Sequence, residues 1–248
     1  MRYLALATDF DGTMASDGRV EAETVNALMR LRASGRRLVM VTGRELPDLN
    51  AIFPHVDAFD VVIGENGGLM HIPSAGTTTC LAPPPPPALV HELRVRGVPV
   101  SVGEVVVATW EAHLADVCAA VRHLGLEHEV DVISNKGAVM LLPAGANKGT
   151  GVARAAAALS VGLDAFVGIG DAQNDYSLLR ACGVGVAVAN AISSLQRQAD
   201  IVTRGARGEG VVEIVDRLLS DDLAGVTPRP RDDRGVVAHE AEARGDRS

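Results

Sequence analysis

The segment YLALATDFDGT, residues 3–13, decides the fold because it joins a short apolar run to a pair of acidic residues. A short apolar run bounded by turn residues is typical of a buried strand, here Tyr3 to Thr8. The strand ends at Asp9, and Asp11 follows two residues later. Because side chains alternate along an extended chain, Asp9 and Asp11 are expected on the same side if the extended geometry continues.

Strand and helix patterns alternate after this segment. Apolar residues at spacings of three and four predict a helix between Val20 and Arg36, and Leu38 to Val41 and Asp60 to Ile63 predict further strands. After Asn147 an alanine-rich helix to Leu159, strands over 165–169, 184–188 and 200–202, and a closing helix over 210–219 resume the alternation. This pattern predicts an α/β fold with a doubly wound parallel sheet.

Residues 69–143 break the rhythm and predict an inserted α+β domain. They contain five consecutive prolines at 83–87, helix patterns near 88–95 and 111–124, a strand pattern over 98–109, and a hairpin pattern over 129–133 and 139–142. We interpret the prolines as a rigid connector and residues 1–68 and 144–220 as the main domain. Residues 221–248 mix charge with Pro and Gly without an apolar period, which predicts a disordered tail or a linker.

The composition excludes several classes of protein. The chain of 248 residues is 47% hydrophobic and long enough to bury a sizeable core, so it is not a disulfide-stapled mini-protein. A net charge of −8 argues against a nucleic-acid partner. The three cysteines, Cys80, Cys118 and Cys182, are far apart and are expected as reduced thiols. With neither a signal peptide nor a membrane-spanning run in the pattern, we expect a cytoplasmic protein with no membrane partner.

Polar clusters stand where the predicted strands end, and ligands of doubly wound sheets bind beyond those carboxyl ends. Besides Asp9 and Asp11, the cluster residues are Thr42, Gly43, Asp171, Asn174 and Asp175, with Lys148 at the start of the alanine-rich helix. Each cluster alone is also compatible with a turn or a helix cap, and Lys148 with a solvated amine. Their common placement at one end of the sheet favours a functional site.

These motifs resemble those of the haloacid dehalogenase-like hydrolases, and within them the Cof-type and sucrose-phosphatase-like branch with a type IIB cap. DFDGT at 9–13 is similar to the family's first motif and VTGR at 41–44 to its second. Lys148 matches the third motif and GDAQND at 170–175 the fourth. The resemblance covers about residues 3–219 and implies that 1–68 and 144–220 form a Rossmann-like catalytic core and 69–143 its cap domain.

The resemblance also implies roles for the residues at the strand ends. Asp9 would be the nucleophile that forms an aspartyl-phosphate, and Asp11 would be the general acid and then the general base. The groups implied to bind the phosphoryl oxygens are Thr42, the amide of Gly43, Lys148 and Asn174. The groups implied to bind Mg²⁺ are Asp9, the backbone carbonyl of Asp11 and Asp171, with Asp175 in support.

A cation is also required by electrostatics. Unit like charges about 4 Å apart repel by about 4 kcal/mol at an effective dielectric near 20, so a phosphate dianion cannot approach these carboxylates unaided. Mg²⁺ prefers carboxylate, phosphate and water oxygens. We therefore expect a magnesium-dependent phosphatase acting on a small phosphorylated metabolite, such as a sugar phosphate or a phosphoglycolate-like acid.

Two other functions stay open on the sequence. A phosphomutase or phosphotransferase would use the same Asp9 intermediate, and a non-catalytic sensing or docking module would use none of the chemistry. Arg44 can face either the body or the crevice. In the insert we interpret four polar residues as solvated surface groups: His113, Arg122, Asn135 and Lys136.

Overall fold

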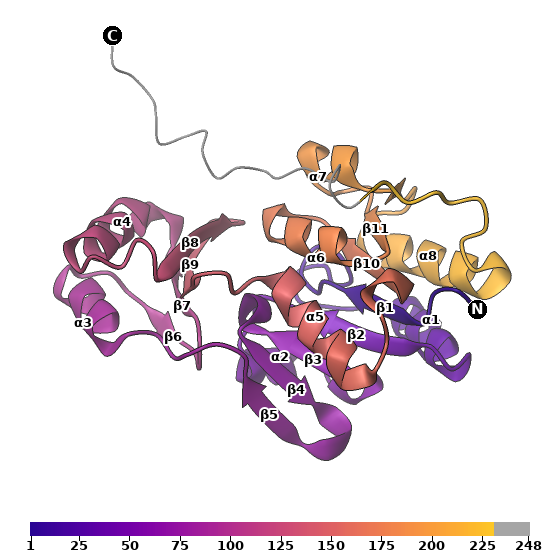
Figure 1. The fold of residues 1–248 in the computed structure, drawn as a ribbon, viewed down its shortest axis with the longest axis horizontal. Coiled ribbons are helices and arrows are strands. Elements are labelled where there is room, and N and C mark those ends of the chain that lie inside the picture. The colour runs from indigo at the N-terminus through magenta and orange to yellow at the C-terminus, as the bar shows by residue number, and fades with distance from the viewer. Residues whose placement is uncertain (231–248) are drawn as a thin grey trace, which may run out of the picture.

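The computed structural model describes residues 1–230, which form a body around an eight-stranded sheet and an inserted domain around a four-stranded sheet (Figure 1). The body sheet has the order β12-β11-β10-β1-β2-β3-β4-β5. Its strands are β1 (Ala5–Thr8), β2 (Arg37–Val41), β3 (Val61–Gly64), β4 (Leu69–Ile72), β5 (Thr77–Cys80), β10 (Phe166–Gly170), β11 (Val184–Ala187) and β12 (Ile201–Val202). Neighbouring strands are parallel from β12 to β3, and β4 and β5 are antiparallel.

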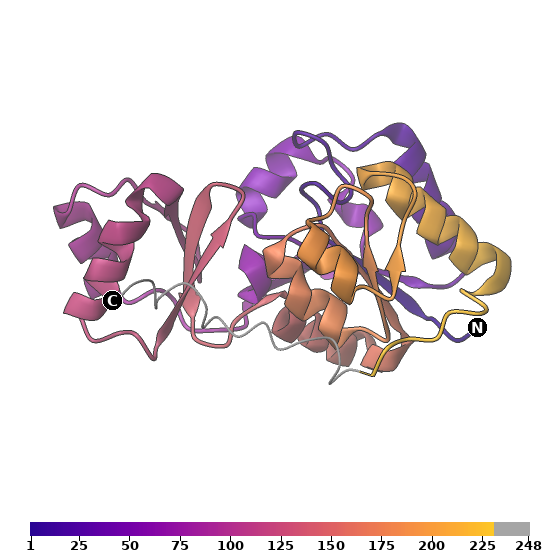
Figure 2. The ribbon, with the colours of Figure 1, turned by 90° about the horizontal axis from the view of Figure 1, so that it is seen from above.

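Helices cover both faces of the body sheet, as the expected doubly wound fold requires. Helices α1 (Ala22–Ala33) and α8 (Arg207–Asp221) pack together on one face, and α5 (Lys148–Leu159) and α6 (Tyr176–Ala181) pack together on the other (Figure 2). The shorter helices α2 (Leu46–Ile52) and α7 (Ser193–Gln198) complete the body. Strand residues such as Leu6, Val39 and Val167 are fully buried because both faces are covered.

The strand order places the site. From β1 the chain moves outward through β2 and β3, and it later returns on the other side of β1 through β10 and β11. The order therefore reverses between β1 and β10, which lie side by side in parallel register with Thr8 opposite Ile169. A doubly wound sheet opens a crevice at such a point, because the loops leave the two strands in opposite directions.

The inserted domain is an antiparallel sheet covered by two helices on one face. Its strands β6 (Ser101–Val102), β7 (Val107–Trp110), β9 (Ala138–Pro143) and β8 (Val130–Asn135) lie in that order. Helices α3 (Pro87–Val95) and α4 (Leu114–His123) bury Leu93 and Val117 against the sheet. The other face of the sheet is turned toward the body (Figure 2).

The strand expected over 98–109 is interrupted, which corrects the sequence interpretation. Residues 103–106 form a turn between β6 and β7, and the Glu65 carboxylate of the body accepts the backbone N–H groups of Glu104, Val105 and Val106 at 3.1, 2.7 and 2.9 Å. Glu65 is 2% exposed. A tertiary contact from the body therefore shapes this part of the insert, and an apolar run cannot reveal it.

The boundary expected before Leu69 is also wrong, because β4 and β5 belong to the body. They extend the body sheet through antiparallel pairing with β3, in which Ile63 lies opposite Met70 and Gly64 opposite Leu69. The chain enters the insert only after Cys80, through the proline run. A short hairpin pattern does not show which sheet edge it will join. Here the hairpin pairs with the edge of β3.

Part of the expected tail contacts the body, which corrects its start at residue 221. After α8 the chain turns at Asp222, whose Oδ1 lies 2.8 Å from Arg36 Nη2, and Leu223 is 2% exposed against the body core. The Arg229 N–H donates to Asp200 Oδ1 at 2.8 Å. One buried Leu carries no periodic signal, so composition alone assigned this stretch to the tail. Residues 231–248 lie outside the described part of the chain.

Two further expectations concern membranes and thiols. Within residues 1–230, every helix is too short or too polar to traverse a bilayer. Cys80, Cys118 and Cys182 form no disulfide bond within the described residues, in line with the expectation from their spacing.

Candidate active site

The candidate site lies at the carboxyl ends of β1 and β10. Asp9 directly follows β1, and Asp171 directly follows β10. The Asp9 N–H donates to the Ile169 carbonyl at 3.0 Å, which holds the starts of the two loops together. Asp9 is 4% and Asp171 5% exposed. The topology therefore brings these two carboxylates to one place, as their positions after parallel strands predicted.

Lys148 joins two carboxylates in a buried ionic cluster. Its Nζ lies 2.6 Å from Asp9 Oδ1 and 2.5 Å from Asp175 Oδ1, and its side chain is 1% exposed. The Asn147 side chain caps α5 by accepting the Thr150 N–H at 3.0 Å, which fixes the first turn. A Cβ at Gly149 would lie 2.5 Å from the Ser177 carbonyl oxygen, so only glycine lets this turn come so close to α6. Local packing thus holds the amine at Asp9.

The charges in this cluster do not balance. Burial raises the pKa of Asp9 to about 7, with Asp175 and Asp171 adding to the effect and Lys148 opposing it. Burial alone would lower the pKa of Lys148, but the carboxylates of Asp175 and Asp9 outweigh it and raise that pKa. Lys148 is therefore charged at neutral pH. Burial and the neighbouring carboxylates disfavour the ionised form of Asp9.

Asp175 supports the site through hydrogen bonds. Its Oδ2 accepts the N–H groups of Asp171 and Ala172, both at 2.9 Å, while its Oδ1 accepts from Lys148. Asp175 is fully buried. Both of its oxygens are thus engaged, and the carboxylate orients Lys148 and the loop after β10.

The donor set fits one divalent cation. Carboxylate oxygens of Asp9, Asp171 and Asp175 lie within 4.8 Å of one another, and all three residues are buried. The hydrogen bonds among the described residues occupy Asp9 Oδ1 and leave Oδ2 without a partner. Hard oxygen ligands and uncompensated negative charge are what a divalent ion such as Mg²⁺ requires.

Asp11 is held by Arg44. The guanidinium donates from Nε and Nη2 to the two Asp11 oxygens, both at 2.7 Å, and it lies 5.8 Å from the centre of the Phe10 ring. This bond raises the pKa of Arg44, with burial opposing it. The two possibilities left open for Arg44 are thereby resolved: it pairs within the body, at the crevice. Both oxygens of Asp11 are thus engaged by Arg44, at 35% side-chain exposure of Asp11.

Lys136 is part of the site, which corrects its interpretation as a solvated surface residue. It stands in the turn between β8 and β9, and its Nζ lies 2.5 Å from the Asp11 carbonyl oxygen and 2.9 Å from the Asp171 carboxylate. A Cβ at Gly12 would lie 2.6 Å from Asp171 Oδ2 and 2.7 Å from this amine, and Gly12 has a φ of 81°. The insert therefore closes over the site through a lysine.

The residues implied to bind phosphate differ in how they lie relative to the crevice. Thr42 is fully buried, and its Oγ1 accepts the Arg44 N–H at 3.1 Å. Gly43 lies under the insert, where a Cβ would come 3.5 Å from Met140 Sδ. Asn174 donates from Nδ2 to Asn66 Oδ1 at 3.0 Å. The structure thus brings Thr42 and Gly43 to the crevice and engages the Asn174 amide with a neighbouring amide.

Sequence reasoning missed three contributions to the site. Thr13, the last residue of the DFDGT motif, donates from Oγ1 to Asp171 Oδ1 at 3.0 Å. Asn66 is 1% exposed and has its Nδ2 unpartnered among the described residues. Lys136 carried one usable signal: the chain has only two lysines, and the other is Lys148.

Comparison with known proteins identifies the family. The family model of the haloacid dehalogenase-like hydrolases matches residues 6–82 and 102–215, and the chain belongs to this family. The chain is 31% identical to a phosphoglycolate phosphatase of Methanothermobacter thermautotrophicus over 223 residues, which is 87% of this chain and 98% of that protein. It is 32% identical to a phosphoglycolate phosphatase of Natronomonas pharaonis over 220 residues, covering 86% and 96% of the two chains.

The solved structures agree on the fold. A subclass IIB sugar phosphatase of the same superfamily superposes with a TM-score of 0.72 at 18% identity and covers 86% of this chain and 98% of its own. The expected fold class is therefore confirmed, and the family model confirms the expected family. Together with the relatives, the family match confirms the expectation of an enzyme, a phosphatase of this family.

Proposed function

We propose that the protein is a magnesium-dependent phosphatase that hydrolyses a small phosphorylated metabolite through an aspartyl-phosphate on Asp9. The observation that carries the proposal is the position of Asp9, a buried carboxylate with Oδ1 held 2.6 Å from Lys148 and Oδ2 unpartnered among the described residues. One oxygen is thereby oriented and the other is available to a reacting atom.

In the first step Asp9 Oδ2 attacks phosphorus, and the bond from phosphorus to the ester oxygen breaks. The protonated Asp11 carboxyl gives its proton to the leaving alkoxide, and the Asp9 ester forms. In the second step Asp11 takes a proton from water, whose oxygen attacks phosphorus and breaks the bond to Asp9. Because Arg44 engages both Asp11 oxygens, the Asp11 side chain must leave Arg44 to reach the leaving group and act as an acid.

Phosphoryl transfer depends mainly on positioning and charge compensation. Lys148, the Thr42 hydroxyl and the Gly43 amide would bind the transferring oxygens, with Asn174 adding an amide once it leaves Asn66. Mg²⁺ would be bound by Asp9, the Asp11 carbonyl and Asp171, and Asp175 would support it indirectly. When bound, the ion supplies positive charge that lets a phosphate dianion approach the carboxylates.

The insert and the relatives support the proposed substrate class. Met140 and Lys136 of the insert contact the body at Gly43 and Asp171, so a polymer has little room above the site. The relatives named phosphoglycolate phosphatases support a phosphoglycolate-like acid, and the structural neighbour named a sugar phosphatase supports a sugar phosphate.

The test is phosphate release from a panel of phosphorylated metabolites with and without Mg²⁺. We expect release that needs the ion and disappears in Asp9→Asn, whereas Asp57→Asn, at an exposed position, keeps full activity. Equal release by wild type and Asp9→Asn would refute the proposal. Transfer of the phosphoryl group to a second sugar without release of phosphate would instead identify a phosphotransferase.

A further inference from the structure

Lys136 forms the one ion pair between the insert and the body among residues 1–230. It comes from the β8–β9 turn, where it has a φ of 50°, and its side chain is 42% exposed. Pairing of Asn135 with Ala138 and the bond from the Glu111 N–H to the Gly137 carbonyl at 2.9 Å anchor the turn. The backbone of Lys136 is thus fixed, while its side chain is long and half in solvent.

The Lys136 amine contacts groups that the proposed metal ion would also contact. It contacts the Asp11 carbonyl and the Asp171 carboxylate, which are two of the three groups proposed above to bind the ion. A divalent ion between those groups would repel an ammonium at contact distance. Loading of the site therefore requires Lys136 to withdraw from Asp171 while its turn stays over the crevice.

The displaced amine then lacks a counter-ion on the protein. The neighbouring Asp11 carboxylate is already paired with Arg44 through both oxygens, and Asp175 is engaged below the site. Lys136 comes from the insert, which faces the body over the site, and we place its amine on the leaving-group side for that reason. An anionic group on the substrate is the partner that this position can receive.

We propose that Lys136 selects phosphate monoesters whose leaving group carries a second acidic group, a short carboxylate. This inference rests on the proposed function and names its substrate class. When the divalent ion and the substrate bind, Lys136 exchanges Asp171 for the substrate carboxylate. The same residue is thus a counter-ion to Asp171 in the metal-free site and a specificity determinant for the substrate.

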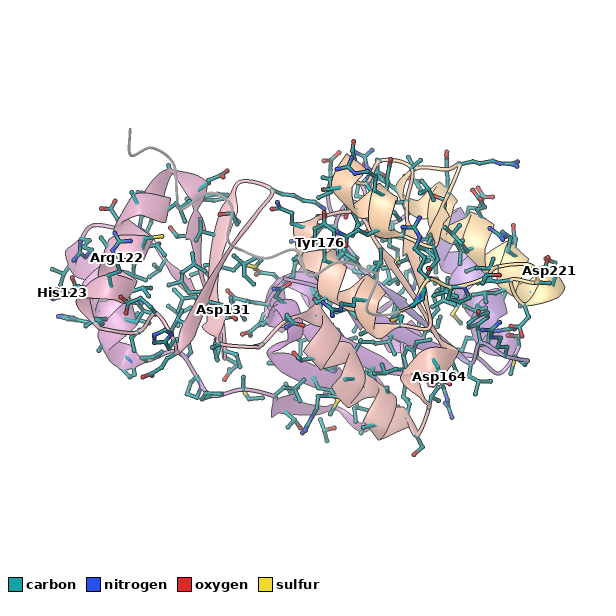
Figure 3. All side chains as sticks on the ribbon, turned by 45° about the horizontal axis from the view of Figure 1, so that its top comes forward. Arg122, His123, Asp131, Asp164, Tyr176 and Asp221 are labelled. Carbon is teal, nitrogen blue, oxygen red and sulfur yellow. The ribbon has the colours of Figure 1, made fainter. Side chains whose placement is uncertain are left out.

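The first test compares two substrates of similar size with Mg²⁺ present, 2-phosphoglycolate and 2-hydroxyethyl phosphate, the second of which lacks the carboxylate. We expect Lys136→Met to lower kcat/KM for 2-phosphoglycolate about 10- to 150-fold more than for 2-hydroxyethyl phosphate, mainly through KM. Lys136→Arg should keep most of the preference because it keeps the charge. Arg122→Met, which removes an equal charge at the far end of the insert, should leave both substrates unaffected (Figure 3).

The second test follows Mg²⁺ binding without turnover. Trp110 is the only tryptophan of the chain and is paired with Ala138 beside the Lys136 turn, so its emission reports on this part of the insert. Because the ion and the amine exclude each other, Lys136→Met should bind Mg²⁺ about 5- to 150-fold more tightly than wild type, and Arg122→Met should not differ from wild type.

Each of the following outcomes would overturn the inference. Equal losses on the two substrates would show that Lys136 serves the fold of the insert or the reaction itself. No loss on either substrate, or equal Mg²⁺ affinity of Lys136→Met and wild type, would show that no exchange occurs. If the wild type releases phosphate only from monoesters whose leaving group is uncharged, this inference alone is refuted. If it releases phosphate from no monoester, the proposed function is refuted as well.

Discussion

Removal of the Asp9 charge is expected to stabilise the metal-free protein while abolishing turnover. The pKa of Asp9 is about 7 in the folded chain, against its ordinary value of 3.8. Each pKa unit corresponds to about 1.4 kcal/mol, so ionisation of Asp9 disfavours the folded state by about 4 kcal/mol when complete. Asn has the shape of the neutral carboxyl and does not carry this cost.

The effect has a defined pH dependence. Because the folded pKa lies above the unfolded value, the cost is absent below about pH 4, grows as the pH rises toward 7, and is complete above it. The pKa of Lys148 is also raised, from 10.5, so its favourable contribution is constant over this range. The stabilisation by Asp9→Asn should thus be as much as about 4 kcal/mol at pH 8 and about 2 kcal/mol at pH 5.

The assay is urea unfolding followed by circular dichroism in EDTA at both pH values. Asp57→Asn removes a carboxylate from an exposed position and should change the free energy of unfolding by less than about 0.5 kcal/mol. The reasoning is refuted if Asp9→Asn is no more stable than wild type at pH 8, or if its extra stability is not smaller at pH 5. Either result would show that ionisation of Asp9 does not disfavour the folded state.

Three further outcomes follow from the site and the fold. Lys148→Met should destabilise the protein by about 3–5 kcal/mol in urea unfolding, because it leaves the buried Asp175 carboxylate without its cation, and full stability together with full activity would contradict this. Gly12→Ala should lower the free energy of unfolding by about 1–2 kcal/mol, because residue 12 has a φ of 81°. The same change should weaken Mg²⁺ binding in a calorimetric titration, because a Cβ would lie 2.6 Å from Asp171 Oδ2. Unchanged binding would count against Asp171 as a ligand. Leu223→Ala should cost about 2–5 kcal/mol because that side chain is buried, whereas Val202→Ala, at a 45% exposed position, should cost much less, and equal effects would argue that residue 223 is not packed.

The sequence was most informative where local pattern and topology agree. The apolar runs that become β1, β2 and β10 end at polar residues, and a parallel sheet necessarily brings such ends to one edge. Asp9 and Asp171 could therefore be assigned to one site without coordinates. Lys148 could be added because Asn147 and the glycines around it mark the start of a helix.

Contacts between distant segments could not be read in the same way. The pairing of β4 with β3 and the burial of Leu223 depend on which surfaces the rest of the fold leaves open. Lys136 reaches Asp171 only because the insert closes over the body, and no periodic pattern encodes the docking of two domains. Residues of the insert that face the site were therefore the least predictable part of the function.

The most direct test of the account is a single turnover of the wild type, quenched in acid and analysed by peptide mass spectrometry. We predict a phosphoryl group on the peptide that contains Asp9, formed before free phosphate appears and absent from Asp9→Asn. Release of phosphate without any phosphorylated peptide, or a phosphoryl group on another residue, would contradict it.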